Sequence, residues 1–166
     1  MRVLLAIIGC VLVPAAAMAT GPRNEAGDRQ FIDRAYSINE GEIELGKLAQ
    51  KKGTTPEVRE FGQRMVGDHT VALEQLRDVA LRNNLSLPDQ LQPEQVDLYK
   101  RLSVLEGTRF DDAYIDHMVS GHEGAIRTFA DEADRGQNPA LRSYAEKELP
   151  MLRAHESIAK RDLHRM

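Results

Sequence analysis

The sequence predicts an all-α protein, a four-helix bundle with a short extra helix between its second and third long helices. Three observations support this fold class. The 166 residues suit a single domain with a hydrophobic core. Helix-favouring residues are plentiful, whereas aromatic residues make up only 5% and Trp is absent. Four long segments also carry apolar residues at alternating intervals of three and four, and short Gly- or Pro-containing turns separate most of them.

The N-terminal residues have the pattern of a secretory signal peptide. A short positive start at Arg2 is followed by an apolar run over residues 3–13, and Ala17-Met18-Ala19 supplies a small-residue cleavage motif. We therefore expect a signal peptide at residues 1–19, a flexible lead-in at 20–27 and the bundle domain at 28–166.

Removal of that signal peptide would also remove Cys10, the only cysteine. Disulfides and thiolate metal sites would then be excluded. The sequence around Cys10 resembles a lipoprotein processing motif, but the apolar run before it is short, so we expect a soluble exported protein. The formal net charge of −4 without a basic patch argues against nucleic acid as a partner. No later apolar stretch is long enough to span a membrane.

Each of the first two long helices has a polar residue within its apolar stripe. The first helix is predicted at residues 28–51, with the stripe Phe31, Ala35, Ile38, Glu42, Leu45 and Ala49. Thr55 and Pro56 are typical of a helix start, which places the second helix at residues 56–83. Its stripe is Phe61, Met65, His69, Ala72, Leu76 and Val79.

The second half of the chain repeats this arrangement. A shorter helix is predicted at residues 93–106, and Gly107 separates it from a long helix at 108–135. The stripe of that long helix is Ile115, Met118, His122, Ala125 and Phe129. Asn138 and Pro139 open the last helix, at 139–164. Its stripe is Leu141, Tyr144, Glu148, Met151, His155 and Ile158.

The four long helices each contribute one metal-ligating side chain to their seams, namely Glu42, His69, His122 and His155. At a rise of about 1.5 Å per residue, counting from the turns places these side chains near one level of the bundle. Helix bundles hold metals at such positions. We therefore predict a mononuclear site of one glutamate and three histidines for a transition metal, with Zn, Cu, Fe and Ni as candidates. Asp68 and Asp116 flank the site as further ligands or as acceptors for the imidazoles.

A second pattern concerns methionine. Met65, Met118 and Met151 each precede a histidine of this group by four residues, so the thioether lies one turn away on the same helix face. A thioether beside an imidazole suits Cu(I), which keeps copper among the candidates, with Met65 and Met118 as ligands. Alternatively, these methionines fill irregular gaps in the core.

Two alternatives to a metal-binding protein remain. The histidines could form a hydrogen-bonded network in a metal-free structural or interaction module. A mononuclear metal oxidase or hydrolase would need an open coordination position, and the sequence contains none of the common catalytic motifs. Glu-x-x-His, the motif of di-iron carboxylate bundles, is also absent. Homo-oligomers are compatible with a bundle, but no residue in the sequence selects them.

Several spaced motifs resemble the exported bacterial family catalogued as domain of unknown function 4142. They are Glu42–Ala49, Phe61–His69, Phe110–Tyr114, Met118–Glu123 and Leu149–His155. The resemblance implies a ferritin-like bundle located in the periplasm, and it carries Glu42, Asp68, His69, His122 and His155 over as family motif positions. No activity comes with it. We expect a periplasmic metal-binding protein with a role in metal handling or envelope stress.

Overall fold

The computed structural model describes residues 25–163 and contains five helices and no strand in that range. Four are long, namely α1 (Glu25–Lys52), α2 (Pro56–Arg82), α4 (Thr108–Arg135) and α5 (Pro139–Leu163). The fifth, α3 (Pro93–Ser103), is the short extra helix expected between the second and third long ones. The all-α, ferritin-like bundle prediction is confirmed. The predicted signal peptide and residues 20–24 of the lead-in lie outside the described residues.

The helix boundaries agree with the predictions to within a few residues. Helix α1 begins at Glu25, so three residues that we expected in the lead-in are helical. Helix α3 ends at Ser103, three residues earlier than predicted. Gly107 has a φ of 65°, a conformation that glycine adopts without the steric cost of a side chain, and it directly precedes α4.

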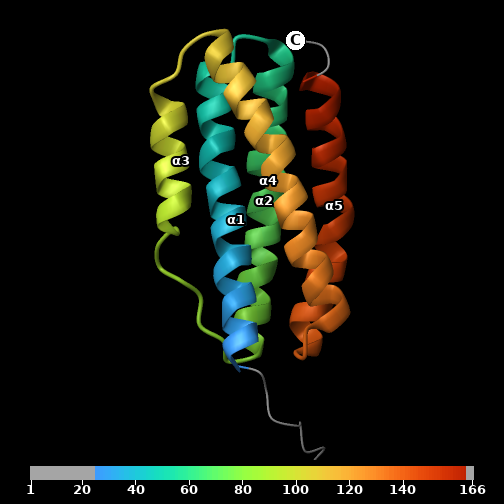
Figure 1. The fold of residues 1–166 in the computed structure, drawn as a ribbon. Coiled ribbons are helices and arrows are strands. Elements are labelled where there is room, and N and C mark those ends of the chain that lie inside the picture. The colour runs from blue at the N-terminus through green and yellow to red at the C-terminus, as the bar shows by residue number, and fades with distance from the viewer. Residues whose placement is uncertain (1–24, 164–166) are drawn as a thin grey trace, which may run out of the picture.

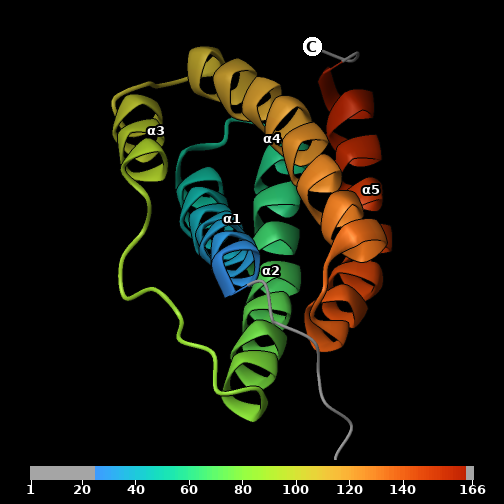
Figure 2. The ribbon, with the colours of Figure 1, turned by 60° about the horizontal axis from the view of Figure 1, so that its bottom comes forward.

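The long helices form a square in which every neighbour is antiparallel (Figure 1). Helix α1 packs along α2 and α4 along α5, and the square is closed by contacts of α2 with α5 and of α1 with α4. The segment 83–107 runs the length of the bundle and includes α3, which stands outside the square beside α1 (Figure 2). One long crossover of this kind is typical of ferritin-like bundles.

The predicted capping residues hold the two short turns. The Thr55 side chain accepts a hydrogen bond from the Val58 amide at 3.2 Å, and the Asn138 side chain accepts one from the Ala140 amide at 3.0 Å. Each cap satisfies one of the amides that the first turn of a helix leaves without a partner. These turns set the register of α1 against α2 and of α4 against α5.

The core consists of two apolar clusters, one toward each end of the bundle. One contains Phe31, Leu76, Phe129, Leu141 and Tyr144, and the other contains Leu45, Phe61, Met65, Phe110 and Met118. Buried polar residues, including Asn39, His69, His122 and His155, belong to neither cluster. On α2, α4 and α5 the histidines fall in sequence between the residues of the two clusters, and Asn39 of α1 contacts His69, so a polar layer crosses the middle of the bundle. No helix among the described residues has the length and apolarity of a membrane span.

Helices α1 and α2 approach closely at a pair of glycines, Gly46 and Gly62. A Cβ atom added to Gly62 would lie 2.7 Å from the carbonyl oxygen of Gly46, and one added to Gly46 would lie 2.7 Å from that of Gly62. Both distances are shorter than real contacts, so the two backbones leave no space for side chains here.

This contact predicts opposite effects for two glycine replacements in α2. Gly62→Ala should lower the free energy of unfolding by about 1–3 kcal/mol, because the helices must separate to accommodate the methyl group. Gly67→Ala is the matched control, since a Cβ there meets nothing within 4 Å. It should raise stability by up to about 1 kcal/mol through better helix propensity. Urea unfolding followed by circular dichroism measures both, and equal effects would contradict the close approach.

Candidate metal centre

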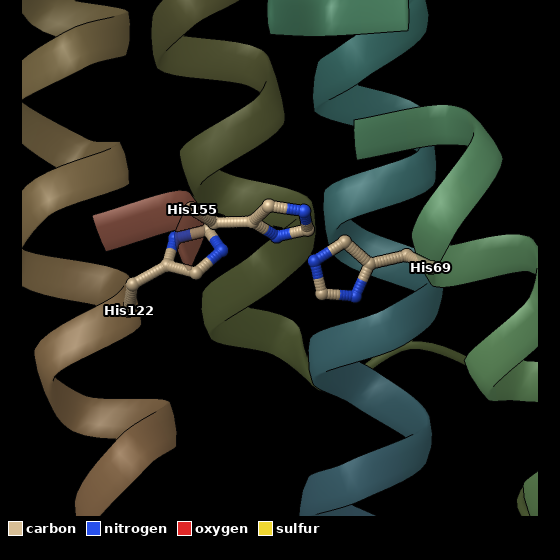
Figure 3. Close-up of side chains that lie close together, drawn as sticks. All are labelled: His69, His122 and His155. Atoms are coloured by element: carbon tan, nitrogen blue, oxygen red, sulfur yellow. The ribbon is translucent and has the colours of Figure 1, made fainter. Parts of the chain in front are cut away.

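Three of the predicted ligands come together in the polar layer. His69 of α2, His122 of α4 and His155 of α5 point toward one another (Figure 3). One ligand nitrogen from each of them lies within 4.8 Å of the other two. The side chains are 0–1% exposed, and their ring centroids are 5.3–5.8 Å apart. We refer to His69, His122 and His155 as the histidine triad.

One nitrogen of each ring is fixed by a hydrogen bond to a different acceptor. His122 Nδ1 lies 2.8 Å from the carbonyl oxygen of Met118, which can only accept. His155 Nε2 lies 2.9 Å from Oδ2 of Asp68. A carbonyl oxygen and a carboxylate oxygen accept hydrogen bonds, so both nitrogens carry the proton and donate it. Because a neutral imidazole has only one N–H, the lone pair is left on His122 Nε2 and on His155 Nδ1.

The third ring is oriented by a residue of α1. Asn39 Nδ2 donates to the carbonyl oxygen of Ala35 at 2.8 Å and lies 3.0 Å from the Tyr144 hydroxyl, which fixes the orientation of the amide. Its Oδ1 therefore accepts the proton of His69 Nδ1, at 2.9 Å. The lone pair of His69 accordingly lies on Nε2.

The three lone pairs are the atoms without partners. His69 Nε2, His122 Nε2 and His155 Nδ1 are all buried and make no hydrogen bond. An unpaired buried polar atom costs about 1–3 kcal/mol, and three acceptors that converge cannot satisfy one another. A cation bound by all three would remove this cost. Metal-bound histidines commonly donate their other N–H to a carboxylate, a carbonyl or water, and each ring here donates to a side-chain or backbone oxygen in that way.

The surroundings keep these rings neutral. The pKa of His69 lies well below its usual value, first because the ring is buried and next because the imidazoles of His122 and His155 are close to it. Burial and then His155 lower the pKa of His122 to about 3. Burial also lowers the pKa of His155, although the hydrogen bond to Asp68 acts in the opposite direction. At neutral pH all three therefore present lone pairs, which is the protonation state that a metal ion requires.

The predicted carboxylate ligand lies beside the triad rather than within it. Glu42 is buried on α1 and is not part of the group whose ligand atoms lie within 4.8 Å of one another. Its Oε1 is 3.9 Å from Nε2 of His117 on α4. Asp68 takes the role of acceptor for His155, the second of its two predicted roles. Glu42 as a ligand stays a prediction.

Two of the three methionines are buried in one apolar cluster next to the triad, whereas Met151 is partly buried and packs against the other cluster. Met65 and Met118 are completely inaccessible and pack among the aromatic side chains of the first of these clusters. The backbone of Met118 also serves the site, because its carbonyl oxygen holds His122. Their role as Cu(I) ligands is untested by this arrangement.

Sequence reasoning missed Asn39 and Tyr144 as parts of the site. The predicted stripe of α1 contains Ile38 at this level, but the buried residue is its neighbour Asn39, which is 1% exposed. Asn39 lies four residues after Ala35 and three before Glu42, so it fits the same heptad spacing. An asparagine in the middle of a long helix, where its propensity is poor, was the available signal.

The buried carboxyl of Glu42 predicts an unusual pH dependence. Burial raises its pKa to about 8, against 4.5 for the ordinary group, so the folded protein retains a proton that the unfolded chain releases between these values. The stability contribution of Glu42 therefore falls as the pH rises through this window. Gln does not ionise, so Glu42→Gln removes this fall in stability with rising pH. The free energy of unfolding of the variant, minus that of the wild type, should therefore increase by up to about 1.4 kcal/mol for each unit by which the pH rises.

Urea unfolding of both proteins in chelator between pH 5 and 8 measures this difference. The histidine contributions are common to both proteins and cancel. A difference that is constant across the window would show that the folded protein ionises Glu42 normally.

Comparisons with known proteins agree with this architecture. A solved crystal structure of a DUF305 fragment from Deinococcus radiodurans superimposes with a TM-score of 0.75, covering 87% of this chain and 100% of that chain at 15% sequence identity, which shows a shared fold. No curated protein matches the chain. A family model described as a domain of unknown function, DUF4142, matches residues 13–161. The chain therefore belongs to the DUF4142 family.

Proposed function

We propose that this protein binds one transition-metal ion at the histidine triad. Two observations support the proposal. One ligand nitrogen of each ring lies within 4.8 Å of the others, and each ring has one buried nitrogen without a hydrogen-bond partner, namely His69 Nε2, His122 Nε2 and His155 Nδ1. Each opposite ring nitrogen is already bonded to an oxygen atom. The arrangement thus supplies both the ligands and the groups that orient them.

Three neutral imidazoles suit Zn, Cu, Fe or Ni. With metal–nitrogen bonds of about 2.0–2.1 Å, tetrahedral coordination brings nitrogens to about 3.3 Å from one another. The ligand atoms of the triad lie within 4.8 Å, so small side-chain rotations suffice to close around an ion. The fourth position would take a water molecule. Copper is favoured over zinc only if the thioethers of Met65 and Met118 also turn toward the ion.

The biological role that we propose is metal handling or response to envelope stress in the periplasm. The support comes from the signal-peptide pattern of residues 1–19 together with the buried triad. A hydrolase or oxidase needs a coordination position that a substrate can reach. Ligand side chains that are 0–1% exposed favour retention of an ion over turnover of a substrate.

The principal alternative is a metal-free module with a buried histidine network. In that case the histidines would satisfy one another, and a chelator would leave the melting temperature unchanged. The unpartnered nitrogens weigh against this alternative, because a network that leaves three acceptors unsatisfied costs stability.

Replacement of a triad residue tests the proposal directly. His122→Ala should abolish stoichiometric binding of Zn²⁺ and with it the metal-dependent rise in melting temperature. In the wild type a ligand at 100 times its Kd adds about 2.7 kcal/mol of stability. Asp112→Asn, on the exposed face of the same helix, is the control and should bind like the wild type. Titration calorimetry and thermal melts measure both quantities, and unchanged binding by His122→Ala would refute the assignment.

The hydrogen bond from His155 to Asp68 predicts a smaller effect. Asp68→Ala should weaken metal affinity by about 10–100-fold while the stoichiometry at saturation stays at one, because the carboxylate orients the ring and raises its basicity. Its side chain is 42% exposed, so the fold should tolerate the change. Competition with a chromophoric chelator gives the affinity. An affinity equal to that of the wild type would show that Asp68 does not support the site.

A further inference from the structure

A second pair of ligand-type side chains lies between α1 and α4. Glu42 Oε1 is 3.9 Å from His117 Nε2. Glu42 Oε2 and His117 Nε2 are both buried atoms without a hydrogen-bond partner, as are the converging nitrogens of the triad. Glu42 is 6% exposed, so its carboxyl is shielded from the water that would normally solvate it. We call Glu42 and His117 the outer pair.

The outer pair lies about one helical turn from the triad. On α1, Glu42 follows Asn39, the residue bonded to His69, by three residues, which is about 4.5 Å along the axis. On α4, His117 precedes His122 by five residues, or about 7.5 Å. Because α1 and α4 are antiparallel, both displacements run toward the same end of the bundle (Figure 1). The pair and the triad therefore occupy successive levels.

Exposure increases from the triad to the outer pair. The triad side chains are 0–1% exposed, Glu42 is 6% exposed, and the His117 side chain is 20% exposed. His117 lies over Gly121, where an added Cβ would be 3.1 Å from its Cε1, so the glycine leaves room for the ring against the helix. The side chains that carry ligand atoms thus form a series from the partly exposed ring of His117, whose Nε2 is itself buried, inward to the triad.

Two other seams between the described helices offer an ion no comparable series. Helices α1 and α2 approach so closely at Gly46 and Gly62 that the backbones leave no space for an ion at that level. Between α2 and α5, Asp68 is already bonded to the protonated Nε2 of His155, and this nitrogen is on the side of the ring opposite the free Nδ1. Between α1 and α4, by contrast, the ligand atoms of the outer pair are unpaired.

We propose that Glu42 and His117 form an outer cation site through which a divalent transition-metal ion reaches the histidine triad. The inference rests on the proposed function of the triad. An ion that binds here displaces the proton of the Glu42 carboxyl, which is released to solvent. The resulting carboxylate oxygen and the imidazole nitrogen are both ligands for borderline ions such as Zn²⁺ and Co²⁺. Two such ligands hold an ion more weakly than three converging imidazoles. The ion consequently moves inward, and one equivalent remains bound at equilibrium.

The experiment measures uptake of Co²⁺ alone by the metal-free full chain, with stopped-flow detection of the visible Co²⁺ absorption. His117→Phe keeps a ring over Gly121 and removes the nitrogen. It should slow uptake at least about tenfold, equivalent to about 1.4 kcal/mol in the barrier. The final stoichiometry, spectrum and affinity should stay as in the wild type. Asp112→Asn, an exposed carboxylate of the same helix, is the control for lost charge and should take up Co²⁺ at the wild-type rate.

Glu42→Gln is the second variant and should show the same slow uptake with unchanged equilibrium affinity. Wild-type uptake rates in both variants would overturn the outer site. Reduced equilibrium affinity in Glu42→Gln would overturn it too, because Glu42 would then belong to the inner ligand set. A wild-type chain that binds no Co²⁺ would instead refute the proposed function of the triad, so the two failures are distinguishable.

Discussion

The middle of this bundle is governed by three imidazole lone pairs that face one another away from water. His69, His122 and His155 are each held by a hydrogen bond on the opposite nitrogen, so none of the rings can turn its free nitrogen elsewhere without losing a partner. Burial also lowers the pKa of the rings, so these nitrogens do not take up protons and remain acceptors that face one another. The fold therefore maintains an arrangement that is costly by itself and favourable around a cation.

The rest of the architecture supports this layer. Apolar clusters on both sides of it supply the burial that stabilises the bundle, and each long helix contributes one or more polar residues at the boundary between them. Asn39 links three helices, since it contacts His69 of α2 and Tyr144 of α5 from its position on α1. The Tyr144 hydroxyl in turn donates to the carbonyl oxygen of Ala72. Polar groups so connected resist the sliding of one helix past another.

Much of this arrangement could be predicted from helical spacing. Apolar residues at intervals of three and four located the four long helices, and a histidine inside the stripe of three helices identified the triad, because residues at this spacing share one helix face. Spacing alone could not decide between Ile38 and Asn39, which are adjacent in sequence and near the same seam. It also could not separate Glu42 from the triad, since a difference of one helical turn is within the error of counting from the turns. Which nitrogen of each ring is free depends on tertiary contacts, and no sequence pattern encodes it.

The most direct test of a metal ion at the triad is a crystal structure of the chain grown with Zn²⁺, with the ion located by its anomalous scattering. We expect one zinc within about 2.0–2.1 Å of His69 Nε2, His122 Nε2 and His155 Nδ1. The hydrogen bonds to Asn39, Met118 and Asp68 should remain in place. Zinc bound elsewhere with no ion at the triad, or zinc bound through His155 Nε2 with Asp68 displaced, would contradict it.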